Sequence, residues 1–177
     1  DRLSVARRMY AFRFGKIPPH RDIAVLRGVE GARMKETYKL VADRFRVPWQ
    51  GRRYDRSNPN ATDIPNQAIN HAATFVECAA DVAVAAVGAL PPLGFIHEDS
   101  SNAFTLDIAD LYRAEVTIPL AFKVARKALD DPTLIIERTL RREAAMEFRR
   151  TKLISNMIER IKELLNVDDG GSNTQRE

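Results

Sequence analysis

The feature that most constrains this fold is a stripe of apolar residues at helical spacing within residues 23–45. The side chains recur three or four positions apart, so at about 100° per residue they share one helix face. The stripe consists of Leu26, Met34, Tyr38, Val41 and Phe45. One charged residue, Glu30, lies inside it, between Leu26 and Met34. Because an unpaired buried carboxylate is costly, Glu30 is expected to bind a cation or to take up a proton.

The same periodicity extends along most of the chain and predicts an all-α fold. The expected helices cover residues 4–14, 23–45, 65–90 and 108–129, the last bent at Pro119. Asp131 and Pro132 are typical of an N-cap and a first helical position, so we expect a helix to start there. Helical pattern then continues to about residue 167, with a break near Thr151.

Between the helices, two segments are predicted to be irregular. Residues 48–63 form a polar loop, and residues 93–106 are expected to be irregular, with short extended pieces at 95–96 and 104–106. The final residues, 168–177, are rich in Gly, Ser and Asn and are predicted to be a disordered tail. We therefore expect one helical domain over residues 1–167.

Composition excludes some classes of protein. At 45% hydrophobic residues the chain is globular, and its one cysteine, Cys78, excludes a disulfide framework and fits a reducing cytoplasm. The longest apolar stretch ends in a proline pair and is too short for a membrane span. The chain starts without methionine, so we expect it to be a piece of a longer protein.

Arginine dominates the positive charge, and the formal net charge is +4. One group of arginines comprises Arg2, Arg7, Arg8, Arg13, Arg21, Arg27 and Arg33, and a second comprises Arg138, Arg141, Arg142, Arg149 and Arg150. Guanidinium groups match phosphate geometry, which favours a polyanionic partner. Alternatively, these arginines cover solvated helix faces and pair with Glu36, Glu137, Glu143 and Glu147.

Glu30 is flanked by Gly28 and Gly31, and each glycine costs a helix interior about 1 kcal/mol relative to alanine. Their missing side chains either let a substrate or another backbone approach Glu30, or allow tight helix packing. Glu30 itself could instead be the buried partner of Arg33 or of another arginine.

Three more residues are candidates for a site with Glu30. His97 follows an apolar segment, residues 93–96, that is predicted to be extended. It is either a metal ligand or a hydrogen-bonded core histidine. Asp107 and Asp110 are three positions apart, so they share one helical face. Asp107 alone is explained as a helix N-cap, whereas Asp110 lies in a turn that should pack inwards. Spacing alone does not establish that these residues converge.

These residues lie in segments that resemble the CRISPR-associated integrase, the larger protein of the spacer-acquisition complex. The three signature-like segments are residues 26–33, 94–97 and 107–110, and residues 51–55 and 64–67 further resemble the type I-E subgroup. The resemblance runs in order from about Leu3 to Leu165. One departure is Pro65, which is tolerated in a first helical turn.

The resemblance implies an all-helical catalytic domain that binds one divalent ion, Mg²⁺ or Mn²⁺, through Glu30, His97 and Asp110. Asp107 would be an additional acidic residue at the edge of the site. The implied reaction, in antiviral defence, inserts spacer DNA into the CRISPR repeat by transesterification of a 3′-hydroxyl onto a phosphodiester. Candidate DNA-backbone contacts are Arg33, Arg113, Arg138, Arg141 and Arg142.

The family also implies partners. These are spacer-precursor and repeat DNA, a second copy of the full-length protein, and a small companion protein that docks on an N-terminal β-sheet domain, which we expect this chain to lack. Two other functions stay open from the residues alone. They are a non-catalytic basic helical nucleic-acid-binding module, and a structural fragment with an incidental acidic pocket.

Overall fold

The computed structural model describes residues 2–16, 19, 22–53, 63–98 and 100–165, and these residues are mostly helical and contain no strand. The helices are α1 (Arg2–Phe14), α2 (Ile23–Phe45), α3 (Ile64–Ala86), α4 (Ala103–Leu111), α5 (Ile118–Asp130), α6 (Ile136–Thr151) and α7 (Leu153–Leu165), with one π-helical segment, η1 (Arg113–Thr117), between α4 and α5. The predicted all-α fold is confirmed.

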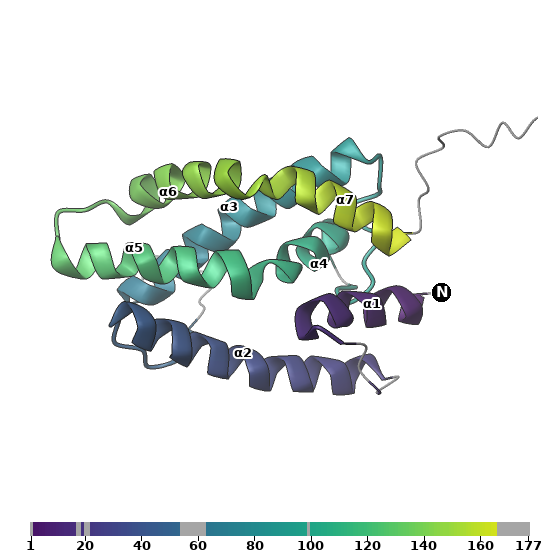
Figure 1. The fold of residues 1–177 in the computed structure, drawn as a ribbon, viewed down its shortest axis with the longest axis horizontal. Coiled ribbons are helices and arrows are strands. Elements are labelled where there is room, and N and C mark those ends of the chain that lie inside the picture. The colour runs from purple at the N-terminus through teal and green to yellow at the C-terminus, as the bar shows by residue number, and fades with distance from the viewer. Residues whose placement is uncertain (1, 17–18, 20–21, 54–62, 99, 166–177) are drawn as a thin grey trace, which may run out of the picture.

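The central element is α3, which packs against α4, α5, α6 and α7. In the view of Figure 1, α5 lies between α2 and α6 and contacts both, and α1 lies beside α7. Asp63 caps α3 by accepting a hydrogen bond from the Asn66 backbone N–H at 3.0 Å, with Pro65 in the first turn. Small buried side chains such as Ala72 and Ala80 let the neighbouring helices approach this helix closely.

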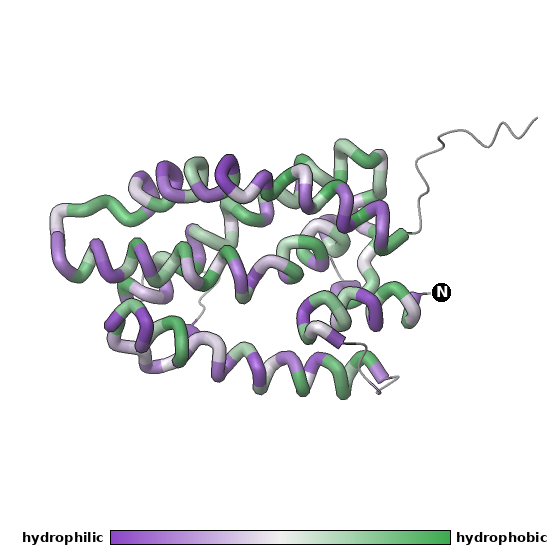
Figure 2. The backbone as a smooth tube through the Cα atoms, viewed as in Figure 1, coloured by the Kyte–Doolittle hydropathy of each residue, from purple (hydrophilic) through white to green (hydrophobic). Residues whose placement is uncertain are grey.

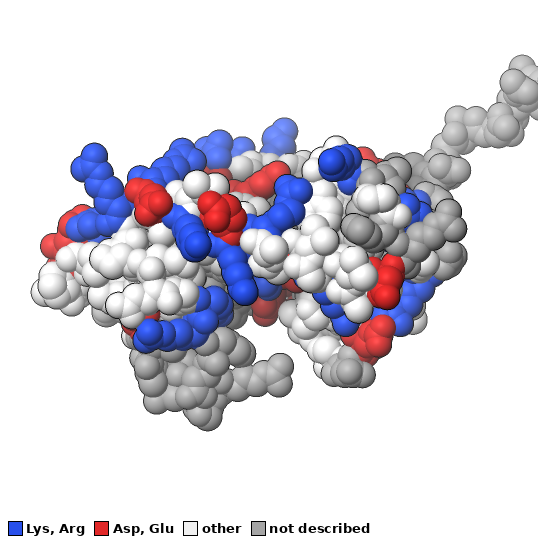
Figure 3. Space-filling view, turned by 90° about the horizontal axis from the view of Figure 1, so that it is seen from below, with Lys and Arg blue, Asp and Glu red and all other residues white. Residues whose placement is uncertain are grey.

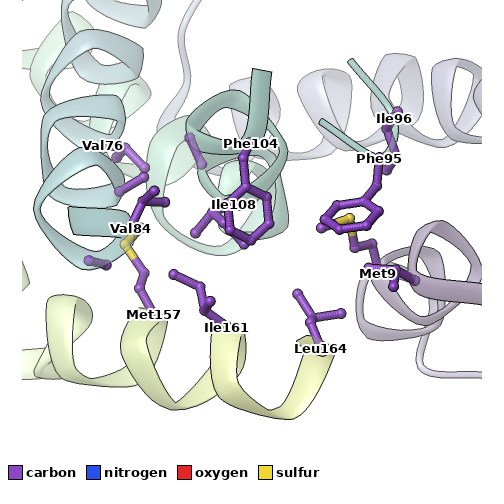
Figure 4. Packing of buried hydrophobic residues seen from close by; sticks show 14 of the residues in the cluster. Met9, Val76, Val84, Phe95, Ile96, Phe104, Ile108, Met157, Ile161 and Leu164 are labelled. Atoms are coloured by element: carbon purple, nitrogen blue, oxygen red, sulfur yellow. The ribbon is translucent and has the colours of Figure 1, made fainter. Parts of the chain in front are cut away.

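Two hydrophobic clusters form the core. The first joins α1, α3, α4 and α7 with the segment before α4, and Figure 4 shows Phe95, Phe104 and Met9 facing α7 residues across it. The second joins α2, α3, α5 and α6 around Tyr38 and Phe122. Burying a large apolar side chain such as Phe104 or Phe122 contributes about 1.5–3 kcal/mol. The first cluster therefore holds α4 in place, and the second holds α2.

Two predicted boundaries are confirmed. The helix predicted over residues 23–45 has these bounds. The break near Thr151 is also present, because Lys152 adopts a left-handed backbone with φ of 50° between α6 and α7.

Four predictions of local structure are wrong. Residues 104–106 are helical within α4, and α3 ends at Ala86 instead of residue 90. The helix expected over 108–129 is interrupted by the π-helical segment, so the irregularity precedes Pro119. Asp131 does not start a helix: its carboxylate accepts hydrogen bonds from the Thr133 N–H and hydroxyl, and α6 begins at Ile136.

Some expectations fall outside the described residues. These are most of the polar loop, at residues 54–62, and the tail at 168–177, so the proposed end of the domain stays a prediction. Within the described residues, no helix is both long enough and apolar enough to cross a membrane.

Candidate metal centre

Glu30 lies where the sequence predicts, on the inward-facing stripe of α2. Leu26 and Tyr38 are buried, and Met34, Val41 and Phe45 pack partly buried against the second core cluster. Hydrophobic and hydrophilic residues alternate along this helix (Figure 2). The Glu30 side chain is 19% exposed, so it is mostly removed from water.

The partner of Glu30 is Arg13, from the last turn of α1. The Arg13 Nη1 group donates a hydrogen bond to Glu30 Oε1, and the Arg13 side chain is only 7% exposed. Arg33, the alternative partner considered above, instead holds its guanidinium 4.6 Å from the centre of the Phe14 ring. The buried arginine partner of Glu30 therefore comes from another helix.

His97 is oriented by Asp107, which lies fully buried inside α4. The Asp107 carboxylate accepts hydrogen bonds from the backbone N–H groups of Phe95, Ile96 and His97 at 2.7–3.0 Å. Its Oδ1 also lies 2.7 Å from His97 Nδ1. The N-cap role expected for Asp107 is thus wrong, because its side chain binds the preceding segment and α4 begins four residues earlier.

The two pKa values of this pair move in opposite directions. Burial alone would raise the pKa of Asp107, but the hydrogen bonds from His97 and from the three backbone N–H groups overcome it and lower that pKa. The same hydrogen bond from Asp107 raises the pKa of His97, against the opposing effect of burial. His97 is 38% exposed, so it is not a core histidine.

Gly94 is required by the tight path of this segment. A Cβ atom at Gly94 would lie 1.9 Å from the His97 carbonyl oxygen and 2.5 Å from the Ala103 Cβ. Two arginines from other helices also anchor the segment, since Arg27 donates to the Ile96 carbonyl and Arg2 Nε to the Phe95 carbonyl at 3.1 Å. The position of the His97 ring is therefore fixed from three helices.

Asp110 lies one turn beyond Asp107 and joins the two halves of the site. Its Oδ2 is 4.0 Å from His97 Nε2 and 3.8 Å from Arg13 Nη2. Its Oδ1 pairs with Arg113 Nη2 at 2.5 Å. Arg113 belongs to the π-helical segment, and such segments are frequent at functional sites. Arg13 thus lies between Glu30 and Asp110, and His97 adjoins Asp110.

The donor set fits a divalent ion, with one condition. Asp107 occupies His97 Nδ1 and leaves Nε2 as the ligand atom, which is the usual arrangement of a metal-binding histidine. Two ligands of one ion, each bonded at about 2.0–2.3 Å, lie within about 4.6 Å of each other, and His97 Nε2 and Asp110 Oδ2 meet this limit. As the described side chains stand, no three carboxylate, imidazole or thiol groups are grouped closely enough to hold a metal ion. Arg13 would have to leave the carboxylates.

The sequence did not identify three residues of this site. Arg13 is one of many N-terminal arginines, and no local pattern separates it from the others. Burial, together with nearby Glu30, raises the pKa of Tyr10 to about 12, so this phenol stays protonated beside Arg13. On α3, burial and the charge of Asp110 raise the pKa of Glu77.

The glycines beside Glu30 do not serve tight helix packing. Among the residues that the structure describes, none has an atom within 4 Å of a Cβ built at Gly28 or Gly31, so that interpretation is wrong. Space for an approaching substrate is present on this face. Figure 3 views the face that carries α2 and shows basic side chains interspersed with acidic ones.

The predicted DNA-binding arginines lie in two places. Arg33 is exposed on α2 and Arg113 contacts Asp110, so both are near the site. The remaining three, Arg138, Arg141 and Arg142, are exposed on α6, on the other side of α5 from α2 (Figure 1). Arg141 pairs with Glu137 within its own helix, as the solvated-face alternative predicts.

Comparison with known proteins identifies the family. The family model described as CRISPR associated protein Cas1 matches residues 5–139, which include all four candidate site residues. The chain belongs to the Cas1 family. It is 36% identical over 165 residues to a CRISPR-associated endonuclease Cas1 of Geobacter sulfurreducens and 35% identical over 165 residues to that of Escherichia coli strain K12, covering 93% of this chain in each case.

A solved structure supports the same Cas1 assignment. The crystal structure of a TtCas1–DNA complex superposes with a TM-score of 0.82 at 34% identity, covering 96% of this chain and 60% of that one. The chain spans about half the length of the curated relatives it matches, 53% of each of the two named above. The family resemblance found in the sequence is therefore confirmed.

The segments at residues 51–55 and 64–67, which resemble the family, are joined by the buried residue Asn66. Asn66 Oδ1 accepts a hydrogen bond from the Arg53 backbone N–H at 2.9 Å, and Asn66 Nδ2 donates to the Gly51 carbonyl at 3.0 Å. The described parts of these two segments therefore pack on each other.

Proposed function

We propose that this chain carries the metal-dependent active site of a DNA integrase and endonuclease that inserts spacer DNA during CRISPR adaptation. Glu30, His97 and Asp110 would hold one Mg²⁺ or Mn²⁺ ion. The observation that carries the proposal is the closeness of His97 Nε2 to Asp110 Oδ2, at 4.0 Å, with Glu30 bound to the arginine that lies beside Asp110. Relatives with about one-third identical residues are named endonucleases.

Glu30, His97 and Asp110 would hold the ion, which would supply Lewis-acid polarisation of a phosphoryl oxygen and stabilisation of charge on the attacking or leaving oxygen of a transesterification. The chain orients this site through Asp107, which fixes the His97 ring and leaves Nε2 without a proton in the neutral tautomer. His97 must lose its proton to bind a metal, and Asp107 raises the pKa of His97 above its ordinary value of 6.5. Protons should therefore compete with the ion even at pH values above 6.5.

The proposed partners follow from the family. The solved TtCas1 relative is a complex with DNA, and this supports DNA as the substrate here. We propose that the full-length protein forms a homodimer, binds a small companion protein and acts in the cytoplasm, where an exposed free cysteine such as Cys78 stays reduced. Arg33 and Arg113, close to the carboxylates, are the proposed contacts to the DNA backbone at the site.

Calorimetric titration with Mn²⁺ tests the ligand set. Glu30→Gln, His97→Ala and Asp110→Asn should each lower Mn²⁺ affinity and reduce Mn²⁺-dependent cleavage and strand transfer on branched DNA by at least about 100-fold. Glu30→Gln is chosen because glutamine can still accept the hydrogen bond from Arg13. Glu36→Gln, an exposed carboxylate of the same helix, is the matched control and should leave both measurements unchanged.

The second candidate function is a basic helical module that binds nucleic acid without chemistry. The ion pair between Glu30 and Arg13 favours it, because that pair satisfies the carboxylate without a metal. The positions of Asp110, 3.8 Å from the same arginine, and of His97, 4.0 Å from Asp110, argue against it, since a purely structural pair needs neither. A ligand variant that keeps full activity would exclude its residue from the ligand set. Absence of Mn²⁺ binding and of cleavage in the unaltered chain would leave this second function.

A further inference from the structure

Arg13 occupies the position between two of the three proposed metal ligands. Its Nη1 bonds Glu30 Oε1, and its Nη2 lies 3.8 Å from Asp110 Oδ2. A guanidinium and a divalent ion both neutralise carboxylates, so they cannot both occupy this place.

We propose that Arg13 is the resident cation of this site: its guanidinium neutralises Glu30 and Asp110 in the metal-free protein and moves off them when a divalent ion binds. The inference rests on the proposed metal-binding function. Arg13 is thereby a positioning residue, which acts through the ligand carboxylates and sets the affinity of the site for its ion.

The contacts of Arg13 are incomplete for a buried cation. Nη2 is too far from Asp110 for a hydrogen bond, and neither Nη2 nor Nε has a hydrogen-bond partner within the described part of the chain, although both atoms are buried. Unpaired buried donors are costly, so this placement is held less firmly than a fully bonded one. A guanidinium left with two open donors is therefore suited to displacement.

The surroundings leave room for the displaced group. A cavity of about 80 Å³ is lined by Arg13, Glu30 and Asp110, and also by Arg33 and Glu115. A water molecule needs about 10–15 Å³ of such volume, so several waters or a moved guanidinium fit. Glu115 offers a further carboxylate in the same cavity, and the Tyr10 ring already lies 5.4 Å from the Arg13 guanidinium.

Arg113 does not substitute for Arg13. It contacts Asp110 alone among the proposed ligands, and its side chain is 41% exposed, compared with 7% for Arg13. Water screens the exposed pair more strongly, so Arg113 competes less with an ion. Arg13 is thus the cation whose removal should change metal affinity most.

The test is calorimetric titration of Mn²⁺ into this chain and its variants. Arg13→Gln removes the competing charge and should tighten Mn²⁺ binding about tenfold, within the range typical of coupled sites. Arg44→Gln removes the same charge from an exposed arginine in the last turn of α2, outside this cavity, and should change the affinity by less than about twofold. Arg13→Gln should also lower the melting temperature without metal, and Mn²⁺ should raise it more than in the unaltered chain.

Arg13→Lys covers the case in which Arg13→Gln does not fold, because it keeps the buried charge but reaches fewer carboxylate oxygens. It should bind Mn²⁺ more tightly than the unaltered chain and less tightly than Arg13→Gln. Mn²⁺ binding that is detected in the Arg13 variants but not in the unaltered chain also supports the inference. Mn²⁺ affinity that stays equal or falls in the Arg13 variants overturns the inference while the metal site stands. If neither the unaltered chain nor any variant binds Mn²⁺, the proposed function fails as well.

Discussion

Two buried acidic clusters in this molecule are built in opposite ways. Between α5 and α6, Glu143 is 5% exposed and pairs with two lysines, at 2.8 Å from Lys123 Nζ and 2.5 Å from Lys127 Nζ. In the candidate metal centre, Glu30 and Asp110 instead share one buried arginine, whose donors are only partly used. The first cluster has two cations for one carboxylate. The second has two arginines, because Asp110 also pairs with Arg113, but its carboxylates are in excess once buried Asp107 and partly buried Glu77 are included.

The pKa values follow this difference. Burial would raise the pKa of Glu143, but the two lysines overcome burial and lower it, so this carboxylate is fully compensated by the chain. On α3, beside the candidate metal centre, burial and, to a smaller extent, the charge of Asp110 raise the pKa of Glu77. A compensated cluster serves packing, whereas an undercompensated one has a place for a further cation.

Asp107→Ala should have the largest effect on stability. It removes the acceptor of three backbone N–H groups and of the His97 ring at a fully buried position, so we expect a loss of about 3–5 kcal/mol in the free energy of unfolding. Urea denaturation measures this loss. Mn²⁺ affinity should also fall about 10- to 100-fold, because the His97 ring is no longer oriented.

Asp81→Ala is the matched control for that variant. Asp81 is exposed on α3 and accepts one described hydrogen bond, from the Thr105 hydroxyl at 2.6 Å, so its removal should cost about 1 kcal/mol and leave Mn²⁺ affinity unchanged. Equal losses for the two variants would mean that the bonds to Asp107 contribute no more than an ordinary surface bond. The contrast between a compensated and an undercompensated cluster would then lose its structural support.

Glu143→Gln tests the compensated cluster and its pH dependence. The lowered pKa means that folding favours the ionised carboxylate, so its stabilisation is present above the ordinary value of 4.5 and is lost as pH falls through the folded value. At neutral pH we expect a loss of about 1–2 kcal/mol, moderated because both lysines are about half exposed. Urea denaturation as a function of pH should show the difference from the unaltered chain shrinking below about pH 4.5.

Mn²⁺ affinity of Glu143→Gln should stay unchanged, since α6 lies on the other side of α5 from α2, away from the candidate metal centre. A loss of metal binding in this variant would show that the two clusters are coupled. A difference in stability that persists unchanged into acid would mean that the lysines do not favour the ionised form.

The sequence predicted α2 and the place of Glu30 because periodicity reports which face is buried. Leu26 and Tyr38 mark that face directly. Periodicity does not report the partner on another helix, and so the pairing with Arg13 could not be predicted. The grouping of Glu30 with His97 and Asp110 came from family resemblance, and the positions of their side chains depend on how α1, α2 and α4 pack.

Capping patterns were less reliable because one local motif fits more than one structure. Asp131 followed by Pro132 suits a helix start, yet here the Asp131 carboxylate closes a short turn by accepting from Thr133. Asp107 also suits an N-cap by its spacing, but its four hydrogen bonds reach back to residues 95–97. Tertiary contacts decide how long the loop between two helices is and which groups a carboxylate accepts hydrogen bonds from.

The smallest expected effect on stability comes from the exposed arginines of α6, which adjoin the compensated cluster. Changing Arg138, Arg141 and Arg142 together to alanine should alter the free energy of unfolding by less than about 0.5 kcal/mol, because exposed ion pairs such as Arg141 with Glu137 contribute little.

If these residues bind the DNA backbone, the slope of log affinity against log salt concentration should fall by about one for each phosphate that is no longer neutralised. Fluorescence anisotropy with a labelled duplex at several salt concentrations measures that slope. The triple lysine variant retains the charge and should keep the slope near that of the unaltered chain. An alanine variant with an unchanged slope would assign these arginines to a solvated helix face, and DNA binding would then belong to the basic residues around the metal centre.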